Sequence, residues 1–249
     1  MTSRPGPADR RTPRALGLDS RLEEAGFNVA GVLAAEGYDA LVPQAWRSGA
    51  LLPGAGAAVV LGCGGPAFGE AFLRAPEARA EAHPLDRFTA RVVGETARAH
   101  APRWGPTRGL FYWERRGDAF ADLVALGQAC GLGEPGRLGL LLHPVYGPWL
   151  SLRAILLTAA RLEPTPPLAG FEPCRGCPAP CARACPGAAV GPRAFDAAAC
   201  AATTRAHAPC RVACAARRAC VLGPAHAYPP HLERRYRAAA VAELGVAAS

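Results

Sequence analysis

The sequence predicts an α+β protein, in which an N-terminal α/β domain is followed by a small cysteine-rich module. Half of the 249 residues are hydrophobic and 19% are charged, so the chain can bury a sizeable core. Short apolar runs alternate with amphipathic segments over 16–166. Eight of the ten cysteines then fall within the 47 residues of 174–220. These observations favour two folded parts of different character over a disordered chain.

The expected α/β domain, 16–166, follows an N-terminal stretch, 1–15, that is rich in proline and arginine. That stretch has no apolar periodicity, and we expect it to form a flexible tail. Inside the domain, short apolar runs bounded by glycine, proline or charged residues are typical of buried strands. Four such runs are present, at 27–33, 57–63, 109–113 and 138–143.

Two segments between these runs have the apolar spacing of amphipathic helices. The first covers 84–100, and the second covers 118–130, where Asp118 is a suitable N-terminal cap. A further helical stretch is expected at 70–81. The expected apolar faces are Leu85, Phe88, Val92 and Val93 in the first helix, and Phe120, Leu123, Leu126 and Cys130 in the second.

The segment 163–167, Glu-Pro-Thr-Pro-Pro, marks the end of the domain, because it can continue neither a helix nor a central strand. The cysteine-rich module is therefore expected at 167–229. The last part, 230–249, is expected to form a closing amphipathic helix over 231–244 and a short tail, with Pro230 in the first helical turn.

Composition excludes several classes of enzyme. None of the 28 basic residues is a lysine, so P-loop NTPases, kinases and Schiff-base enzymes do not fit. The five serines lie outside any Gly-x-Ser-x-Gly elbow, which disfavours a serine hydrolase. Residues 167–249 carry ten arginines against four acidic residues. A basic excess can attract nucleic acid, but cations that balance buried anions explain it better here, so nucleic acid is an unlikely partner on sequence grounds.

The first 25 residues are charged throughout and do not resemble an export signal. The apolar runs stop well short of the 18 residues that a membrane-spanning helix needs. We therefore expect a cytoplasmic protein with no membrane partner. In that reducing compartment a dense group of cysteines holds metal more often than disulfides.

The cysteine pattern is the strongest functional signal in the chain. Its first part is Cys-x2-Cys-x3-Cys-x3-Cys-Pro, and a looser second part follows. Four thiolates converge on a 4Fe-4S cubane, so a tight loop can supply three of them and a distant cysteine the fourth. The eight candidate ligands are Cys174, Cys177, Cys181, Cys185, Cys200, Cys210, Cys214 and Cys220.

In the bacterial ferredoxin run, the cysteine that precedes proline ligates the other cluster. Applied to this chain, that rule predicts two crossed sets of ligands. One cluster would use Cys174, Cys177, Cys181 and the distant Cys220. The other would use Cys200, Cys210, Cys214 and, from the first run, Cys185.

Other interpretations of these residues stay open. Eight cysteines could hold a pair of tetrahedral zinc ions, or they could be free thiols of a site that has lost its metal. Cys63 and Cys130 follow apolar patterns and are expected to be buried hydrophobic side chains. His143 is expected to be structural. The glycine-rich run 62–66 does not have the spacing of a phosphate-binding loop, and Pro66 lacks a donor there.

With its neighbouring segments, the cysteine run resembles epoxyqueuosine reductase and its relatives, including short bacterial iron–sulfur proteins of this kind. The likeness extends over roughly 57–220 and is specific over 131–220. Its residues are Gly131-Leu132-Gly133, His143-Pro144 through Trp149-Leu150, Leu156-Leu157-Thr158, and the run from Cys174 to Cys185-Pro186 and Ala189.

This resemblance implies a nitroreductase-like N-terminal domain able to hold a corrinoid such as cobalamin, and a two-cluster ferredoxin-like module. The reductase's acidic and basic catalytic motif is absent, since 83–88, His-Pro-Leu-Asp-Arg-Phe, is a different arrangement. We also expect no tRNA-binding repeats in this chain. The resemblance therefore implies the cluster sites and the scaffold, and not epoxyqueuosine reduction itself.

Two hypotheses for function follow. The first is an iron–sulfur redox protein that passes electrons through two 4Fe-4S clusters. One version of this hypothesis is a corrinoid-dependent reductase, in which the clusters pass electrons to a corrinoid in the N-terminal domain. Its electron donor and acceptor are not identified by the sequence, and neither are catalytic residues. The alternative is a zinc-stabilised cysteine-rich binding module with a basic surface.

Overall fold

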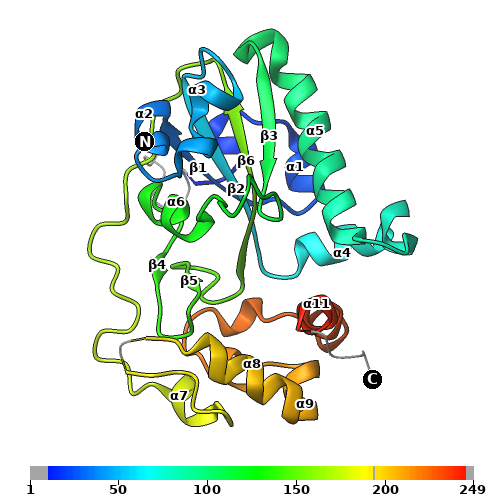
Figure 1. Ribbon diagram of the computed structural model, residues 1–249, viewed down its shortest axis with the longest axis vertical. Coiled ribbons are helices and arrows are strands. Elements are labelled where there is room, and N and C mark those ends of the chain that lie inside the picture. The colour runs from blue at the N-terminus through cyan, green and yellow to red at the C-terminus, as the bar shows by residue number, and fades with distance from the viewer. Residues whose placement is uncertain (1–10, 193, 245–249) are drawn as a thin grey trace, which may run out of the picture. The chain divides into compact units, whose positions relative to one another are not determined.

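The computed structural model describes residues 11–192 and 194–244, so most of the expected tail at 1–15 lies outside the described residues. The chain divides into two compact units. We call Met1–Gly133 with Ser151–Ala169 the N-terminal unit, and Glu134–Leu150 with Gly170–Ser249 the C-terminal unit. The fold is mixed α and β, as expected (Figure 1).

The division differs from the sequence-based one in its treatment of Glu134–Leu150. These residues were expected in the first domain, but they belong to the C-terminal unit. The physical reason is the packing of Leu138, which lies in one apolar cluster with Cys181, Val190 and Ala216. A segment that is distant in sequence therefore completes the core of the cysteine-rich unit.

The N-terminal unit contains a four-stranded sheet with strand order β1-β2-β6-β3. Strand β1 (Val29–Ala34) pairs antiparallel with β2 (Ala57–Gly64), and β3 (Thr107–Phe111) pairs antiparallel with β6 (Leu150–Thr158). Every residue of β2 is buried, as expected for a central strand covered on both faces. Strand β6 was not expected from the sequence, because Ser151 and Arg153 interrupt its apolar run.

Helices α1 (Ser20–Glu24), α4 (Ala67–Arg74) and α5 (Pro84–Trp104) supply side chains to the core on one face of this sheet. Alternate residues of β1 and β2 point into the same core, as the two-residue period of a strand requires. Its centre is aromatic, since the ring of Phe68 lies 5.2 Å from that of Phe27 and 5.3 Å from that of Phe88. The guanidinium of Arg153 lies 4.8 Å above the Phe68 ring.

The remaining elements of the N-terminal unit are short. They are the helices α2 (Ala35–Asp39), α3 (Ser48–Leu51) and α6 (Leu123–Ala129), and the 3-10 turns Arg14–Leu16, Gln44–Trp46 and Pro76–Arg79. Residues 11–15 of the expected tail are in contact with the unit. Arg11 is buried, and its carbonyl accepts a hydrogen bond from the Ala30 N–H.

Two helix predictions for this unit were partly wrong. The helix expected at 118–130 begins at Leu123, because the Asp122 carboxylate, and not that of Asp118, accepts hydrogen bonds from Val124 and Ala125. Phe120 therefore lies outside the helix and is 54% exposed. The helix expected at 70–81 runs from Ala67 to Arg74 and stops before Pro76.

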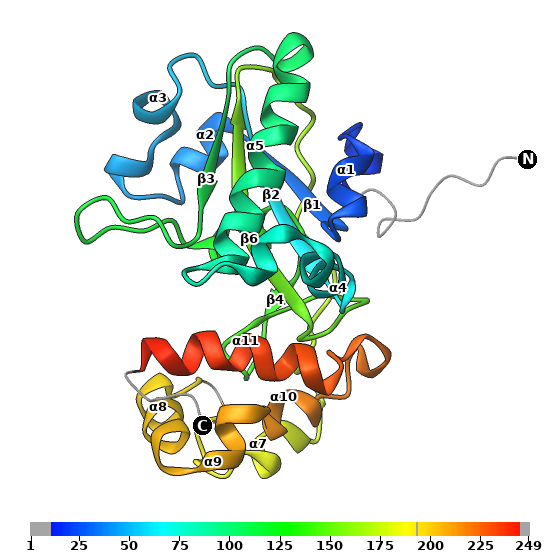
Figure 2. The same cartoon turned by 90° about the vertical axis from the view of Figure 1, so that its right-hand side faces the viewer.

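The C-terminal unit is mainly helical, with one small sheet formed by β4 (Glu134–Pro135) and β5 (Leu141–Leu142). The closing helix is present as α11, and in this unit it lies beside the shorter helices (Figure 2). The helices of this unit are α7 (Pro180–Ala184), α8 (Ala197–Ala206), α9 (Ala208–Val212), α10 (Ala215–Arg218) and α11 (Pro230–Glu243), with a 3-10 turn at Pro224–His226. Across the described residues, every helix is too short or too polar to cross a membrane.

Candidate metal centres

The structure brings four of the eight cysteines around one cavity in the C-terminal unit. We call Cys174, Cys177, Cys181 and Cys220 the first cysteine set. Three of them come from the loop before α7 and from that helix, and Cys220 follows α10. Helices α7 and α10 contact each other, which is how two positions 39 residues apart in sequence meet. Arg137 and six apolar residues complete the lining, the apolar ones being Leu138, Leu142, Ala179 and Val221, with Pro173 and Pro180.

The loop that carries the first set is tightly turned. Ala179, just before α7, has a φ of 51°, in the left-handed region that an alanine rarely occupies. Ala188, after Cys185, has a φ of 50°. Strained backbone of this kind collects at binding sites, where the surrounding contacts impose it. Surrounding contacts, and not local preference, therefore hold both alanines in this conformation.

Electrostatics of the first set favour neutral thiols when no metal is bound. Burial raises the pKa of Cys220, and the nearby Cys181, Cys174 and Cys177 thiolates raise it further. Burial likewise raises the pKa of Cys181. The backbone N–H of Arg137 donates a hydrogen bond to the Cys174 sulfur over 3.5 Å. A metal that binds here must therefore displace the thiol protons. The Arg137 N–H is already directed at the Cys174 sulfur before any metal binds.

The other four cysteines surround a second cavity of the same unit. We call Cys185, Cys200, Cys210 and Cys214 the second cysteine set. Cys185 ends α7, Cys200 lies in α8, Cys210 in α9, and Cys214 precedes α10. A Cβ atom at Gly187 would lie 1.9 Å from the Thr203 hydroxyl of α8. Glycine at this position lets the chain after Cys185 approach the helix that carries Cys200.

Helix α11 contacts the second set with side chains on one face. The Glu233 carboxylate accepts a hydrogen bond from the Cys214 N–H over 3.0 Å. The Arg237 guanidinium donates to the Cys210 carbonyl. Residues four apart on a helix share a face, so both contacts come from the same side of α11. Burial raises the pKa of Cys210, and the Cys214 thiolate raises it further, whereas Arg237 lowers it.

These two groups have the same members as the crossed sets expected from the ferredoxin run. The structure tests the proximity of the cysteines and not their ligation, so the ligand assignment stays a prediction. Over residues 11–192 and 194–244, no three His, Cys, Asp or Glu side chains converge closely enough to bind a single metal ion. The thiols therefore surround each cavity without meeting at one point.

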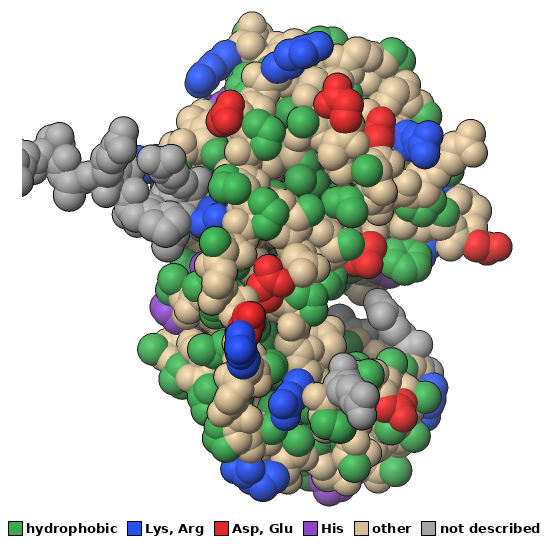
Figure 3. All heavy atoms as spheres, turned by 90° about the vertical axis from the view of Figure 1, so that its left-hand side faces the viewer, with side chains coloured by type: hydrophobic (Ala, Val, Ile, Leu, Met, Phe, Trp, Pro, Cys, Tyr) green, Lys and Arg blue, Asp and Glu red, His purple; other side chains and the backbone are tan. Residues whose placement is uncertain are grey.

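The arginines of the C-terminal unit are largely engaged with the protein itself. Six of them donate to backbone carbonyls, some of which belong to the cysteine loops. On the face drawn in Figure 3, basic side chains are interspersed with acidic and hydrophobic ones and form no continuous stripe. The six arginines and their acceptors are Arg183 with Pro178, Arg205 with Leu244, Arg211 with Thr204 and Arg205, Arg217 with Pro148, Arg218 with Tyr228, and Arg237 with Cys210.

The residues expected to be structural are buried. Cys63 is 2% exposed, and Cys130 is fully buried, with burial raising the pKa of its thiol to about 12. His143 is also buried, and its Nδ1 accepts hydrogen bonds from the Val145 and Tyr146 N–H groups. An acceptor Nδ1 that holds a turn together is a structural role, as expected for this histidine.

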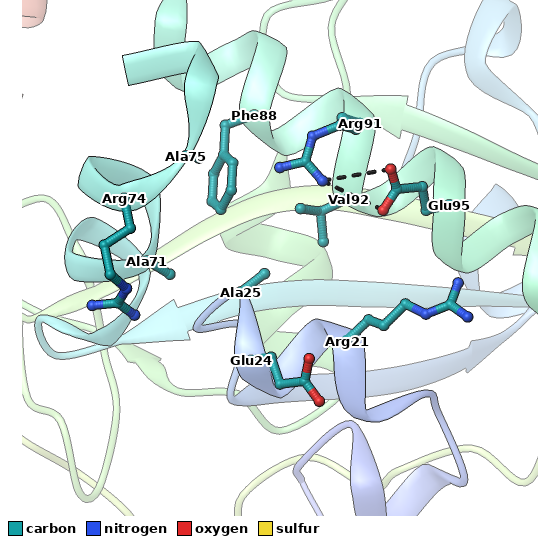
Figure 4. A pocket seen from close by; sticks show the side chains of 10 residues that line it. All are labelled: Arg21, Glu24, Ala25, Ala71, Arg74, Ala75, Phe88, Arg91, Val92 and Glu95. Atoms are coloured by element: carbon teal, nitrogen blue, oxygen red, sulfur yellow. Dashed lines mark hydrogen bonds and ion pairs between the residues drawn. The ribbon is translucent and has the colours of Figure 1, made fainter. Parts of the chain in front are cut away.

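The N-terminal unit has a cavity of 310 Å³ among α1, α4 and α5 that the sequence analysis did not predict (Figure 4). Phe88 and Val92 of α5 form part of its wall, and Arg91 is paired there with Glu95 over 3.4 Å. Three arginines and two glutamates line it in all: Arg21, Arg74, Arg91, Glu24 and Glu95. This cavity is therefore charged, whereas pockets that hold organic cofactors are predominantly apolar.

Comparison with known proteins finds matches among solved structures. No protein-family model matches the chain, and no curated protein matches it. An epoxyqueuosine reductase bound to an epoxyqueuosine-modified tRNA-Tyr stem loop is 15% identical, with a TM-score of 0.56 over 85% of this chain. The Bacillus subtilis epoxyqueuosine reductase is 16% identical, with a TM-score of 0.55.

The chain spans 66% of the length of either epoxyqueuosine reductase chain. A third solved structure is the C. elegans B12-trafficking protein CblC, which is 13% identical, with a TM-score of 0.57 over 91% of both chains. At these identities the likeness concerns the fold and not the activity. The chain is thus related in fold to epoxyqueuosine reductase and to CblC.

Proposed function

We propose that the chain is an iron–sulfur redox protein that holds two 4Fe-4S clusters in a ferredoxin-like C-terminal unit. The observation that carries this proposal is the meeting of cysteines from distant segments in two sets of four. A 4Fe-4S cluster is held by four thiolates, which is the donor set that each cavity offers. Bound clusters would supply one-electron oxidation and reduction.

The arrangement of thiols favours a cluster over a single zinc ion. Four sulfurs bound to zinc must all lie within about 2.3 Å of one metal atom. In a cubane each thiolate binds its own iron atom, so the four thiols stand around the cluster without meeting. Among the described residues, the cysteines line the two cavities and no three of them converge on one ion, which supports the cluster over the zinc ion.

The residues around each set suit an anionic cluster. Apolar side chains line the first cavity and limit access of water, and the Arg137 N–H is directed at the Cys174 sulfur. Each cubane with four thiolates carries a charge of roughly −2, which nearby cations offset. In the second cavity, Arg237 supplies such a cation. The basic excess of this part of the chain is thereby explained without a nucleic-acid partner.

Anaerobically purified protein is expected to be brown, to absorb broadly near ~400 nm and to contain about eight iron atoms per chain, as two 4Fe-4S clusters require. Iron, acid-labile sulfide and zinc should be measured on the same sample. A colourless protein with two zinc ions would contradict the proposal and favour the zinc-stabilised binding module. A protein with neither metal, even after anaerobic reconstitution with iron and sulfide, would favour free thiols.

A second candidate function is corrinoid-dependent reduction, with the corrinoid held by a nitroreductase-like N-terminal unit. Its support is the fold, which the chain shares with a B12-trafficking protein and with epoxyqueuosine reductase. The cavity of 310 Å³ does not fit this cofactor, because charged side chains form much of its wall. The electron donor and acceptor of the iron–sulfur protein follow from neither observation.

Titration with cob(II)alamin tests this second candidate directly. If the protein binds it, the visible and paramagnetic spectra of the cofactor are expected to shift and to saturate with protein concentration. Free cobalamin mixed with serum albumin is the control for nonspecific effects. A spectrum identical to that of the free cofactor at all protein concentrations would leave an electron carrier without a corrinoid.

A further inference from the structure

The two cysteine sets differ in the charge placed beside them. Glu233 of α11 is only 3% exposed, and its carboxylate accepts the Cys214 N–H of the second set. Its counter-ion is Arg218, whose guanidinium contacts the same carboxylate but is 39% exposed. Water screens the exposed cation more strongly than the buried anion. A cluster in the second cavity would therefore experience a net negative field from this pair.

The first set has no such carboxylate, because Glu233 is the only buried Asp or Glu among the described residues. No Asp or Glu lines either cavity among the described residues, and one arginine lines each, Arg137 the first and Arg237 the second, so the charge that distinguishes the two sets is Glu233 at the Cys214 N–H. In the first set, the Arg137 N–H donates a hydrogen bond to the Cys174 sulfur. In the second set, the Cys214 N–H donates its hydrogen bond to the Glu233 carboxylate and not to a sulfur. Net charge and hydrogen bonds to sulfur are two of the factors that set the potential of an iron–sulfur cluster. Both factors favour reduction of the first cluster over the second.

We propose that Glu233 is a positioning residue that holds the reduction potential of the second cluster below that of the first. This inference rests on the proposed function, since it needs both clusters to be present. It assigns an order of reduction potential to the two clusters. An electron that enters at the second cluster would pass downhill to the first, which is held by Cys174, Cys177, Cys181 and Cys220.

The ion pair offers a test in which its two partners have opposite effects. Glu233→Gln keeps an oxygen that can accept the Cys214 N–H but removes the negative charge, so it is expected to raise the lower of the two midpoint potentials. Arg218→Gln removes the counter-ion of the carboxylate, so it is expected to move the same midpoint downward. The higher midpoint is expected to stay constant in both variants. Redox titration followed by electron paramagnetic resonance measures both.

Arg234→Gln is the matched control, because it removes a cation from the exposed face of the same helix. It is expected to leave both midpoints unchanged. Iron is measured on every variant, and absence of iron from the unaltered protein would contradict the proposed function itself. With eight iron atoms present, shifts of the same sign in Glu233→Gln and Arg218→Gln, or no shift in either, would overturn the role of Glu233. If Glu233→Gln loses the second cluster, the Arg218→Gln variant decides. A downward shift of its lower midpoint potential supports the proposal, and absence of that shift overturns the proposal.

Discussion

Replacing Cys220 by alanine is expected to remove about four of about eight iron atoms, the loss expected for Cys181→Ala. The two cysteines are 39 positions apart, yet they line one cavity of the C-terminal unit. Three remaining thiols leave one iron of the cubane without its protein ligand, so the cluster is lost rather than weakened. The double variant Cys181→Ala/Cys220→Ala is expected to lose no more iron than either single variant. Iron and sulfide analysis after anaerobic reconstitution measures the loss.

Cys185→Ala separates crossed from uncrossed ligation. Cys185 is four residues from Cys181 in sequence but lines the other cavity. Its removal is therefore expected to destroy the second cluster, and Cys181→Ala/Cys185→Ala is expected to lose all iron. Cys63→Ala, which removes a buried thiol of the N-terminal unit, is the control and should retain all iron. If Cys181→Ala/Cys185→Ala instead retained half of the iron, the two cysteines would serve one cluster and the crossed assignment would be wrong.

The grouping of the cysteines was predictable because it depends on local spacing. Three thiols within one tight loop can share a cluster only if a fourth arrives from elsewhere, and the cysteine before Pro186 belongs to the other set in the ferredoxin pattern. Sequence could also identify α11 from its amphipathic spacing and Pro230. It could not predict that Glu233 would be buried beside Cys214, because a glutamate on a helix is ordinarily exposed.

The errors in the N-terminal unit have a common cause. Strand β6 contains Arg153, which a pattern of apolar residues treats as an interruption. In the structure that side chain is 8% exposed and its guanidinium lies over aromatic rings, so the strand is buried despite its charge. The same limitation applies to Phe120, which fits the spacing of an apolar helix face but lies before the cap at Asp122. Tertiary contacts, and not periodicity, decide both cases.

Phe68→Ala is expected to lower the free energy of unfolding by about 3–5 kcal/mol, the range for removing a large buried aromatic side chain. Phe68 is fully buried, packs against the rings of Phe27 and Phe88, and lies under the guanidinium of Arg153. The substitution leaves a cavity at the centre of the aromatic core and also removes the ring that faces a buried cation. Urea denaturation followed by circular dichroism measures the change.

Phe120→Ala is the matched control, because it removes the same side chain from a position that is 54% exposed. Its ring contacts the Arg115 guanidinium, which lies 5.2 Å from the ring centre, and a cation–π contact at an exposed site contributes about 0.5–1 kcal/mol. The expected loss of stability is therefore several-fold smaller than for Phe68→Ala. Equal losses for the two variants would show that Phe120 is buried as the helical spacing suggests, and that the helix start at Leu123 is misplaced. A large loss for Phe68→Ala alone would support the aromatic core and the cap at Asp122 together.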